Sequence, residues 1–351
     1  MMTLRTGLFF IARSVILGLI VAALVIVALP LLQNRSTTPL QLDNSPASYA
    51  TAVRRAAPAV VNIYSVGEVQ GSFYSRRPST VFRLGSGVIM DDQGHILTAA
   101  HVVANVSEID VALQDGRQYS GQVIGLDKIS DLAVIQIQAD NLPVIPQNNQ
   151  LRTQVGDVVL AIGNPLNLGQ TITQGIVSAS GGRMGVIHSH ADLIQMDAVI
   201  NEGASGGALV NSQGYLVGIN NARFRDARGQ GIDGIYFAIP YPLAKDIMDT
   251  LILEGEVVRG YFGVQVGGNA HSDPYKQSGI YVTGVDPNSP ADQAGLQADD
   301  FIIEIDGNPM SSAAEGLALV AKTRPGTVVE VRYLRANQEF TTQVTITRLA
   351  D

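Results

Sequence analysis

The sequence predicts a mainly β protein preceded by a single apolar helix at its N-terminus. From about residue 49 to residue 240 the chain is a succession of short apolar runs separated by turns rich in Gly, Asn and Asp. Strand-like runs do not alternate with helical patterns here, which argues for barrels over a parallel sheet. The composition agrees, because 36 glycines and an aromatic content of 6% are typical of a body with many tight turns.

The N-terminal helix is predicted from residues 14–32, which carry no charged side chain and lie between Arg13 and Arg35. About 20 apolar residues span a bilayer as a helix. Because Arg5 and Arg13 precede the span, we expect the N-terminus in the cytoplasm and the rest of the chain exported. Residues 28–30 (ALP) offer no small-x-small cleavage site, so an uncleaved anchor is favoured over a removed signal peptide.

The chain divides around this anchor and around one later helix. We assign residues 1–33 to a cytoplasmic stub and transmembrane anchor. Residues 34–48 are rich in Ser, Thr, Pro and Asn and are interpreted as a flexible linker. Apolar residues at helical spacing between Pro242 and Glu254 predict a connecting helix that ends at Gly255.

Charge and cysteine content exclude several classes of function. A formal net charge of −8 without a dense basic stripe argues against a nucleic-acid partner. The absence of cysteine removes disulfides, a thiol nucleophile and cysteine-ligated zinc. His188 and His190 stand two apart in a polar stretch, which is weak support for a metal site. We therefore expect neither a metal nor a cofactor.

Segment 203–207 (GASGG) contains the most informative residue, Ser205. A serine becomes a useful nucleophile when a base reaches its hydroxyl and backbone N–H groups face the developing oxyanion. The surrounding glycines permit the tight backbone geometry that aims such N–H groups. Taken alone, the segment fits a glycine-rich turn with an incidental serine about as well.

A base and a carboxylate lie upstream, in the order typical of chymotrypsin-type enzymes. His101 follows the largely apolar run 96–100 (ILTAA), and Asp131 directly precedes the apolar run 132–135 (LAVI). In this arrangement His101 takes the hydroxyl proton of Ser205 and later protonates the leaving amine. Asp131 fixes the imidazole tautomer and stabilises the imidazolium. The three residues together, in this order, predict a catalytic triad.

Four motifs resemble the HtrA family of serine proteases, and most closely its membrane-anchored, stress-sensing branch. They are residues 98–103 (TAAHVV), 130–134 (SDLAV), 163–165 (GNP) and 203–207 (GASGG). The resemblance runs from about residue 46 to the C-terminus. It implies that residues 49–255 form a chymotrypsin-like protease domain of two six-stranded β-barrels, with the triad in the cleft between them. The backbone N–H groups of Gly203 and Ser205 would form the oxyanion hole.

One departure from the family pattern lies directly beside the nucleophile. The family has asparagine immediately before the serine, whereas this chain has Ala204, and Glu202 also departs from the pattern of that branch. The expected oxyanion donors are backbone N–H groups, which a side-chain change does not remove. We therefore expect catalysis to survive, with the rate or the balance between inactive and active loop conformations altered.

Residues 256–351 resemble a PDZ domain. The resemblance is carried by 260–264 (GYFGV), 284–291 (GVDPNSPA) and 300–307 (DFIIEIDG). Such domains bind an extended peptide as an added strand and capture its terminal carboxylate in a backbone nest. We expect Tyr261, Phe262, Gly263 and Val264 to bind the peptide, and residues 313–322 to form the helix beside the groove. A turn that merely closes a sheet is the alternative.

Together the two resemblances imply a regulated endopeptidase in the bacterial inner membrane, single-pass, with its catalytic domain in the periplasm. C-terminal peptides of misfolded outer-membrane proteins would dock in the PDZ groove and activate the protease, which would then cut an anti-sigma factor in envelope-stress signalling. The resemblance also places an arginine that links the domains in the loop 180–185, where Arg183 is the candidate. It further implies a homotrimer, with Tyr49 near the interface.

Two other functions are compatible with parts of the pattern. The first is a general degradative protease of the same family, although such members carry two PDZ modules and a longer loop where this chain has residues 67–83. The second is a proteolytically impaired, membrane-bound PDZ adaptor, in which Ala204 marks lost catalysis. Reactivity toward an active-site serine reagent separates the enzyme from the adaptor.

Overall fold

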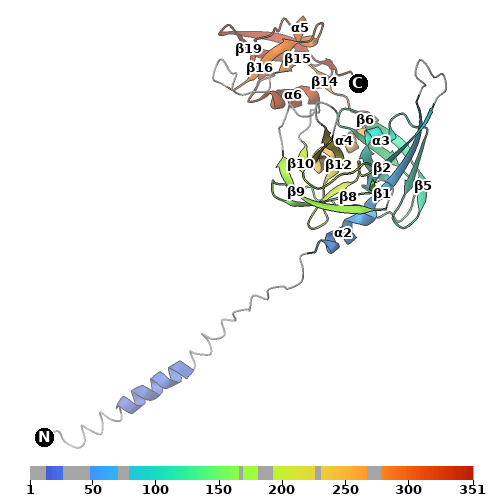
Figure 1. Cartoon of the computed structure of the whole chain (residues 1–351). Coiled ribbons are helices and arrows are strands. Elements are labelled where there is room, and N and C mark those ends of the chain that lie inside the picture. Colours follow the sequence, from blue (N-terminus) through green and yellow to red (C-terminus); the bar gives the residue numbers. More distant parts are fainter. Residues whose placement is uncertain are drawn as a thin grey trace, which may run out of the picture. The chain divides into compact units, whose positions relative to one another are not determined.

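The computed structural model describes residues 13–26, 48–69, 79–165, 169–180, 193–225, 231–266 and 278–350. The chain divides into two units, Met1–Ser48 and Tyr49–Asp351. Figure 1 shows the described helix of the first unit and the strands and helices of the second. The second unit contains both barrels and the C-terminal module.

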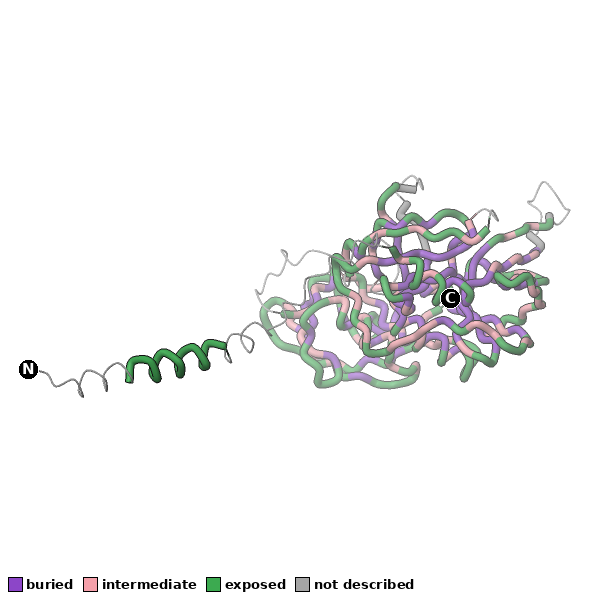
Figure 2. The backbone as a smooth tube through the Cα atoms, turned by 90° about the horizontal axis from the view of Figure 1, so that it is seen from below, coloured by how far each residue is buried: buried purple, intermediate pink, exposed green. Residues whose placement is uncertain are grey.

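The first unit contains a helix over residues 13–26, whose side chains are all exposed (Figure 2). Within the described residues, no helix is both long enough and apolar enough to cross a membrane. Residues 27–32 of the expected span and residues 34–47 of the expected linker lie outside the described part of the chain.

The first barrel is built from an antiparallel sheet of seven segments in the order β5-β4-β1-β2-β3-β7-β6. The segments are β1 (Val60–Val69), β2 (Ser79–Ile89), β3 (His95–Ala99), β4 (Glu108–Ala112), β5 (Gln118–Ser120), β6 (Gln122–Asp127) and β7 (Leu132–Gln136). Only Gly121 separates β5 from β6, although these two segments form opposite edges of the sheet. The sheet therefore curls until its edges meet, and one bent strand appears as two segments where the sequence resemblance implied six strands.

The second barrel is closed, with six antiparallel strands in the order β10-β13-β12-β11-β8-β9. Its strands are β8 (Val158–Gly163), β9 (Thr171–Ser180), β10 (Ile194–Met196), β11 (Ala208–Asn211), β12 (Leu216–Arg225) and β13 (Gly231–Pro240). Apolar side chains from both barrels, such as Leu97 and Ile162, share one buried cluster. The two barrels are thus held together by a common apolar core, which fixes the loops between them.

Helices pack against the apolar clusters of the barrels. They are α2 (Ala50–Ala56), the 3₁₀ turn η1 (Ala57–Ala59), α3 (Ala100–Val103) and α4 (Tyr241–Glu254). Helix α4 buries Ile247, Met248 and Leu251 against strands of both barrels. It ends at Gly255, whose φ of +79° is the left-handed conformation that glycine adopts without a steric penalty. The connecting helix and its stop are confirmed.

The C-terminal module is a sheet ordered β15-β16-β17-β19-β20, with β18 beside β17 and a separate pair β14-β21. Its strands are β14 (Gly260–Tyr261), β15 (Val264–Val266), β16 (Ile280–Val285), β17 (Phe301–Ile305), β18 (Asn308–Pro309), β19 (Val328–Arg335), β20 (Gln338–Thr345) and β21 (Thr347–Arg348); its helices are α5 (Pro290–Gln293) and α6 (Ala313–Lys322). Helix α6 has the bounds that the sequence predicts. The hydroxyl oxygen of Ser312 caps its first turn by accepting from the Glu315 N–H.

Candidate active site and peptide-binding groove

His101 and Asp131 meet at the rim of the first barrel. Strand β3 ends at Ala99, and the single turn of α3 that follows presents His101, while Asp131 directly precedes β7. The Asp131 carboxylate accepts the backbone N–H of His101 at 2.9 Å and lies 2.7 Å from its ring Nδ1. Because a carboxylate accepts, Nδ1 carries the proton in this pair, and Nε2 is left able to act as a base.

The backbone around Asp131 is held as firmly as its side chain. Its φ of +55° lies in the left-handed region, which Asp tolerates better than most residues, and its carbonyl accepts the Ala100 N–H at 3.0 Å. The loop before it is organised by buried Asp127, which accepts the N–H groups of Ile129 and Ser130 as well as the Ser130 hydroxyl. The loop 127–131 therefore fixes the direction of the Asp131 side chain.

The candidate nucleophile follows a tight turn in the second barrel. Ala204 donates its N–H to the Asn201 carbonyl at 3.0 Å, and Gly203 has a φ of +92° at the third position. These features define a type II turn, which requires a positive φ there. Among the described residues, the N–H groups of Gly203 and Ser205 donate to no acceptor. Two unengaged amides beside a serine are the arrangement that an oxyanion hole requires.

Ser86 of β2 clamps this turn from the other barrel. Its side chain is fully buried, and its hydroxyl donates to the Gly203 carbonyl at 2.8 Å while accepting the Asn164 N–H at 2.9 Å. The Ser86 N–H also donates to the Ser205 carbonyl at 2.9 Å. Carbonyls on both sides of Ala204 are thus fixed by one residue, which sequence reasoning did not single out.

Asn221 makes the reverse contact, from the second barrel to Asp131 in the first. The register of β12 against β13 shifts between Asn220 and Ala222, so Asn221 stands at a β-bulge. Its side-chain N–H donates at 3.1 Å to Asp131 Oδ2, the oxygen that also faces His101 Nδ1. Bulges re-aim side chains beside active sites, and this one adds a donor to the acidic residue of the predicted triad.

The backbone brings Ser205 to the same end of the molecule as His101. An added Cβ at Gly206 would lie 2.8 Å from the backbone nitrogen of Ala99, two residues before His101. No hydrogen bond joins the Ser205 hydroxyl to the His101 ring within the described residues, and the His101 side chain is 54% exposed. Such bonds commonly tighten only when a substrate binds. The arrangement suits acyl transfer by a serine, a base and two amide donors.

Ala204, the departure from the family motif, faces inward. It is 8% exposed and belongs to an apolar cluster inside the second barrel. Its Cβ lies against Gly163, where an added Cβ would approach it to 2.8 Å. The Ala204 side chain therefore packs in the apolar interior of the second barrel, and it offers no polar group to the turn.

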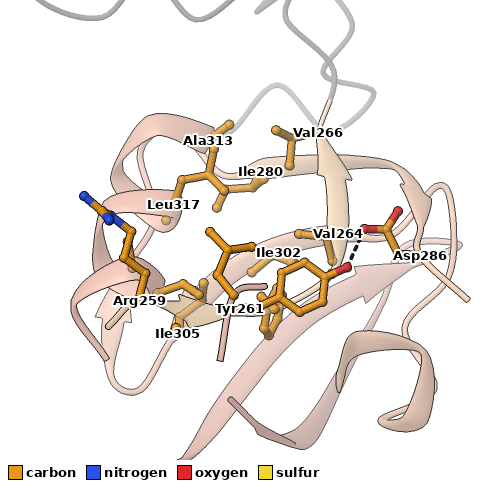
Figure 3. Close-up of a pocket in the computed structure, with 17 residues that line it drawn as sticks. Arg259, Tyr261, Val264, Val266, Ile280, Asp286, Ile302, Ile305, Ala313 and Leu317 are labelled. Atoms are coloured by element: carbon orange, nitrogen blue, oxygen red, sulfur yellow. Dashed lines mark hydrogen bonds between the residues drawn. The ribbon is translucent and has the colours of Figure 1, made fainter. Parts of the chain in front are cut away.

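The C-terminal module contains a pocket of about 300 Å³ between β15 and α6 (Figure 3). All four predicted peptide-binding residues line it, together with apolar side chains such as Ile302 and Leu317. Within the described residues, the N–H groups of Phe262 and Gly263 donate to no acceptor, and Gly263 has a φ of +85°. Strand β15 is an edge of its sheet. An unpaired edge beside open amides suits an added peptide strand that ends in a carboxylate.

One ion pair joins this pocket to the loop of Asp131, the predicted acidic residue of the triad. Arg259, which lines the pocket directly before β14, donates from both terminal nitrogens to Asp127 at 2.6 Å each. The side chains are 14% and 4% exposed, so the pair is shielded from water. A bidentate, desolvated pair of this kind is strong and geometrically specific. Sequence reasoning missed it, because neither residue has a local signal.

Two further residues were predicted to have a role, Arg183 between the domains and Tyr49 near a subunit interface. Arg183, the candidate link between domains, lies outside the described residues. Tyr49 directly precedes α2 and packs partly buried against the shared core.

A polar pair inside an apolar strand, Asn220 and Asn221, was a usable signal for a residue near the site. The Gly-Ser-Gly run around Ser86 was a second signal of the same kind.

The fold and this site together define a chymotrypsin-like serine endopeptidase joined to a PDZ module. Residues 85–219 match the family model described as a trypsin-like peptidase domain, and residues 260–346 match the PDZ domain model. The chain is 48% identical over 350 residues to the serine endoprotease DegS of Escherichia coli strain K12, covering 95% of this chain and 96% of that protein. The chain therefore belongs to the DegS-type branch of the HtrA serine endoproteases.

Solved structures agree with this assignment. The crystal structure of the serine endoprotease from Yersinia pestis is 46% identical, with a TM-score of 0.69, and the match covers 87% of this chain and 99% of that one. The HtrA-type protease AlgW with a tripeptide is 40% identical, with a TM-score of 0.77 over 87% of this chain and 98% of that one. The match covers 96% of DegS but 54% of the probable periplasmic serine endoprotease DegP-like of Chlamydia trachomatis, which disfavours the general degradative protease.

Proposed function

We propose that this endopeptidase is an inner-membrane-anchored periplasmic stress sensor. C-terminal peptides of misfolded outer-membrane proteins dock in the PDZ groove, and the activated enzyme cleaves an anti-sigma factor. The observation that carries the proposal is the largely shielded Arg259–Asp127 pair, because it ties the peptide loop to the loop of Asp131.

The catalytic step follows from the geometry at the barrel rim. Nδ1 of His101 donates to Asp131, so Nε2 accepts the Ser205 proton as the hydroxyl oxygen attacks the scissile carbonyl. The N–H groups of Gly203 and Ser205 stabilise the oxyanion, and His101 returns the proton to the leaving amine. Water then repeats the sequence on the acyl-enzyme. Asp131 stabilises the imidazolium in both half-reactions.

Peptide binding supplies the regulatory input. A C-terminal carboxylate fits the open amides of Phe262 and Gly263, and an apolar last side chain fits the pocket beneath Leu317 and Ile302. The peptide would lie beside Arg259, and any movement of that side chain changes its bond to Asp127. Because Asp127 organises the loop that ends at Asp131, the two sites are mechanically linked.

The anchor and assembly complete the proposal. Residues 14–32 are apolar and uncharged, which suits a single-pass helix with the catalytic domain in the periplasm. An anchored protease meets a membrane-bound anti-sigma factor in two dimensions, so the substrate need not be captured from bulk solution. We further propose a homotrimer formed by the protease domains, with Tyr49 near the interface, and an Arg183 contact between domains.

The test uses the purified full chain in detergent micelles with the periplasmic domain of a membrane-bound anti-sigma factor. Cleavage is measured with and without a peptide that ends in an apolar-aromatic carboxylate, and Ser205→Ala is the control. We expect cleavage to rise with peptide and to vanish in the control. Equal cleavage without peptide would refute the switch. Peptide binding without any cleavage would favour the adaptor instead.

A further inference from the structure

The charges around the peptide pocket are unbalanced. Of its described lining residues, only Arg259 and Asp286 are charged. Arg259 already forms its bidentate pair with Asp127, whereas Asp286 faces only uncharged partners in the described part of the chain. A peptide that brings its terminal carboxylate to this pocket therefore approaches an anion that has no cationic partner among the described residues.

Asp286 is fixed close to the carboxylate-binding loop. Its backbone N–H donates to the Gly263 carbonyl at 2.9 Å. Its side chain accepts the Tyr261 hydroxyl at 2.6 Å, shown as a dashed line in Figure 3, and the Gln265 amide at 2.7 Å. These two donors are neutral and leave further lone pairs on the carboxylate available. Hydrogen bonds from Tyr261 and then Gln265 also hold the Asp286 pKa below its usual value, so the group stays anionic.

The alternation of strand side chains indicates which ligand residue meets this anion. Val264 and Val266 of β15 line the pocket, while Gln265 between them does not. A peptide added to the free edge of β15 alternates in the same way. Its last residue and the third from the end face the pocket, and the penultimate side chain faces the side of Gln265. That is the side from which Gln265 reaches Asp286.

We propose that Asp286 makes the groove selective for peptides whose penultimate residue is lysine or arginine. The proposal deepens the peptide-sensing function above and rests on it. A cationic penultimate side chain reaches a carboxylate that two neutral donors hold in place. The same carboxylate disfavours aspartate or glutamate at that position by like-charge repulsion. The apolar pocket continues to select the last residue, and Asp286 adds a second criterion.

The test compares three peptides that end in the same aromatic residue and differ only in lysine, glutamine or glutamate at the penultimate position. Binding to the full chain in detergent micelles is measured by fluorescence anisotropy. For a partly exposed ion pair we expect the lysine peptide to bind about fivefold more tightly than the glutamate peptide, with glutamine between them. In Asp286→Asn the ratio should fall below about twofold, since the charge is gone while the side-chain shape is kept.

Asp299→Asn is the matched control. Asp299 also accepts a tyrosine hydroxyl, that of Tyr281, but it does not line the pocket. This variant should keep the full preference for lysine. Equal binding of all three peptides to the unmodified chain would overturn the proposal and leave peptide sensing intact. Failure of all three to bind would refute the groove, and the penultimate subsite with it.

Discussion

The two barrels contribute differently to the proposed catalytic site, and each holds residues of the other in place. The first barrel supplies His101 and Asp131, and the second supplies Ser205 and the oxyanion turn. Ser86 reaches from the first to the second with three hydrogen bonds and no exposed surface. Asn221 reaches back with a single bond of 3.1 Å and is partly exposed.

The stronger hold of Ser86 on the oxyanion turn indicates that this turn must be positioned more precisely than Asp131. An oxyanion hole works through preorganised backbone dipoles, and a small rotation of a peptide plane removes a donor. A carboxylate that orients a histidine tolerates more freedom, because it already holds that histidine through two bonds. The clamp on the oxyanion turn should therefore matter more than the clamp on the acid. The variants below test this ranking.

Ser86→Ala should have the largest effect. It leaves the Gly203 carbonyl and the Asn164 N–H without their partner, which costs about 2 kcal/mol of stability. We expect kcat to fall by about tenfold to a hundredfold with KM little changed, because the turn loses its fixed geometry. Ser65→Ala is the control, since it removes another buried serine bond in the same barrel, to the Val102 carbonyl. Equal kcat losses in both variants would contradict the clamp.

Arg259→Gln should uncouple the peptide groove from the triad. Loss of the bidentate bond to Asp127 should reduce the stimulation of cleavage by peptide about fivefold or more. The measurement is the ratio of cleavage rates with and without saturating peptide. Arg348→Gln breaks a neighbouring pair with Glu256 that is half exposed, and it should leave the ratio unchanged. An unaltered ratio in Arg259→Gln would show that the Arg259–Asp127 pair does not transmit peptide binding to the triad.

Asn221→Ala should lower kcat by about threefold to tenfold while KM stays constant, since only the orientation of Asp131 suffers. Asn221→Asp has the same shape but replaces the donor with a second negative group, and it should be worse than the alanine variant. Steady-state kinetics on one peptide substrate give both values. If the aspartate variant proved as active as the unmodified chain, Asn221 would have no role in positioning.

Ala204→Asn should change kcat by less than about threefold, because the oxyanion donors are backbone groups. The buried asparagine must find hydrogen-bond partners beside Gly163, so the melting temperature is the more sensitive readout. A rise in kcat of about a hundredfold would show instead that alanine impairs the native enzyme and would favour the adaptor.

The smallest effect concerns pH. Asp286 has a lowered pKa, so it is charged above its usual titration range, and its charge is lost only as the pH falls through that depressed value. The preference for a penultimate lysine should therefore be constant between about pH 5 and about pH 8. Anisotropy titrations at both ends of this window check it. If the preference for a penultimate lysine disappears near pH 5, a titratable group other than Asp286 causes it.

Much of this architecture could be predicted from sequence because the signals are local. Short apolar runs gave the mainly β body, and helical spacing with a terminal glycine gave α4. Long, specific motifs around His101 and Ser205 gave the family. The pairing of His101 with Asp131, thirty positions apart, was predicted from the order of the His, Asp and Ser residues, and the resemblance supported it.

The clamps and the ion pair escaped prediction for a physical reason. Ser86, Asn221 and Arg259 each act on residues more than seventy positions away, and their geometry depends on barrel closure or on a bulge. The six strands expected in the first barrel appear as seven segments, because a bend at Gly121 divides one strand in two. Ser86 and Asn221 leave a local signal in the Gly-Ser-Gly run and in the Asn pair, but neither signal indicates the distant partner.

In the proposed mechanism, a peptide in the PDZ groove raises the reactivity of Ser205. The most direct measurement is the rate at which a fluorophosphonate probe labels Ser205 in the full chain in detergent micelles, with and without a peptide ending in an apolar-aromatic carboxylate. We predict acceleration by about tenfold, and no effect of the same peptide with an amidated C-terminus. Equal labelling rates in the presence and absence of the peptide, despite saturated binding, would show that peptide binding does not activate Ser205.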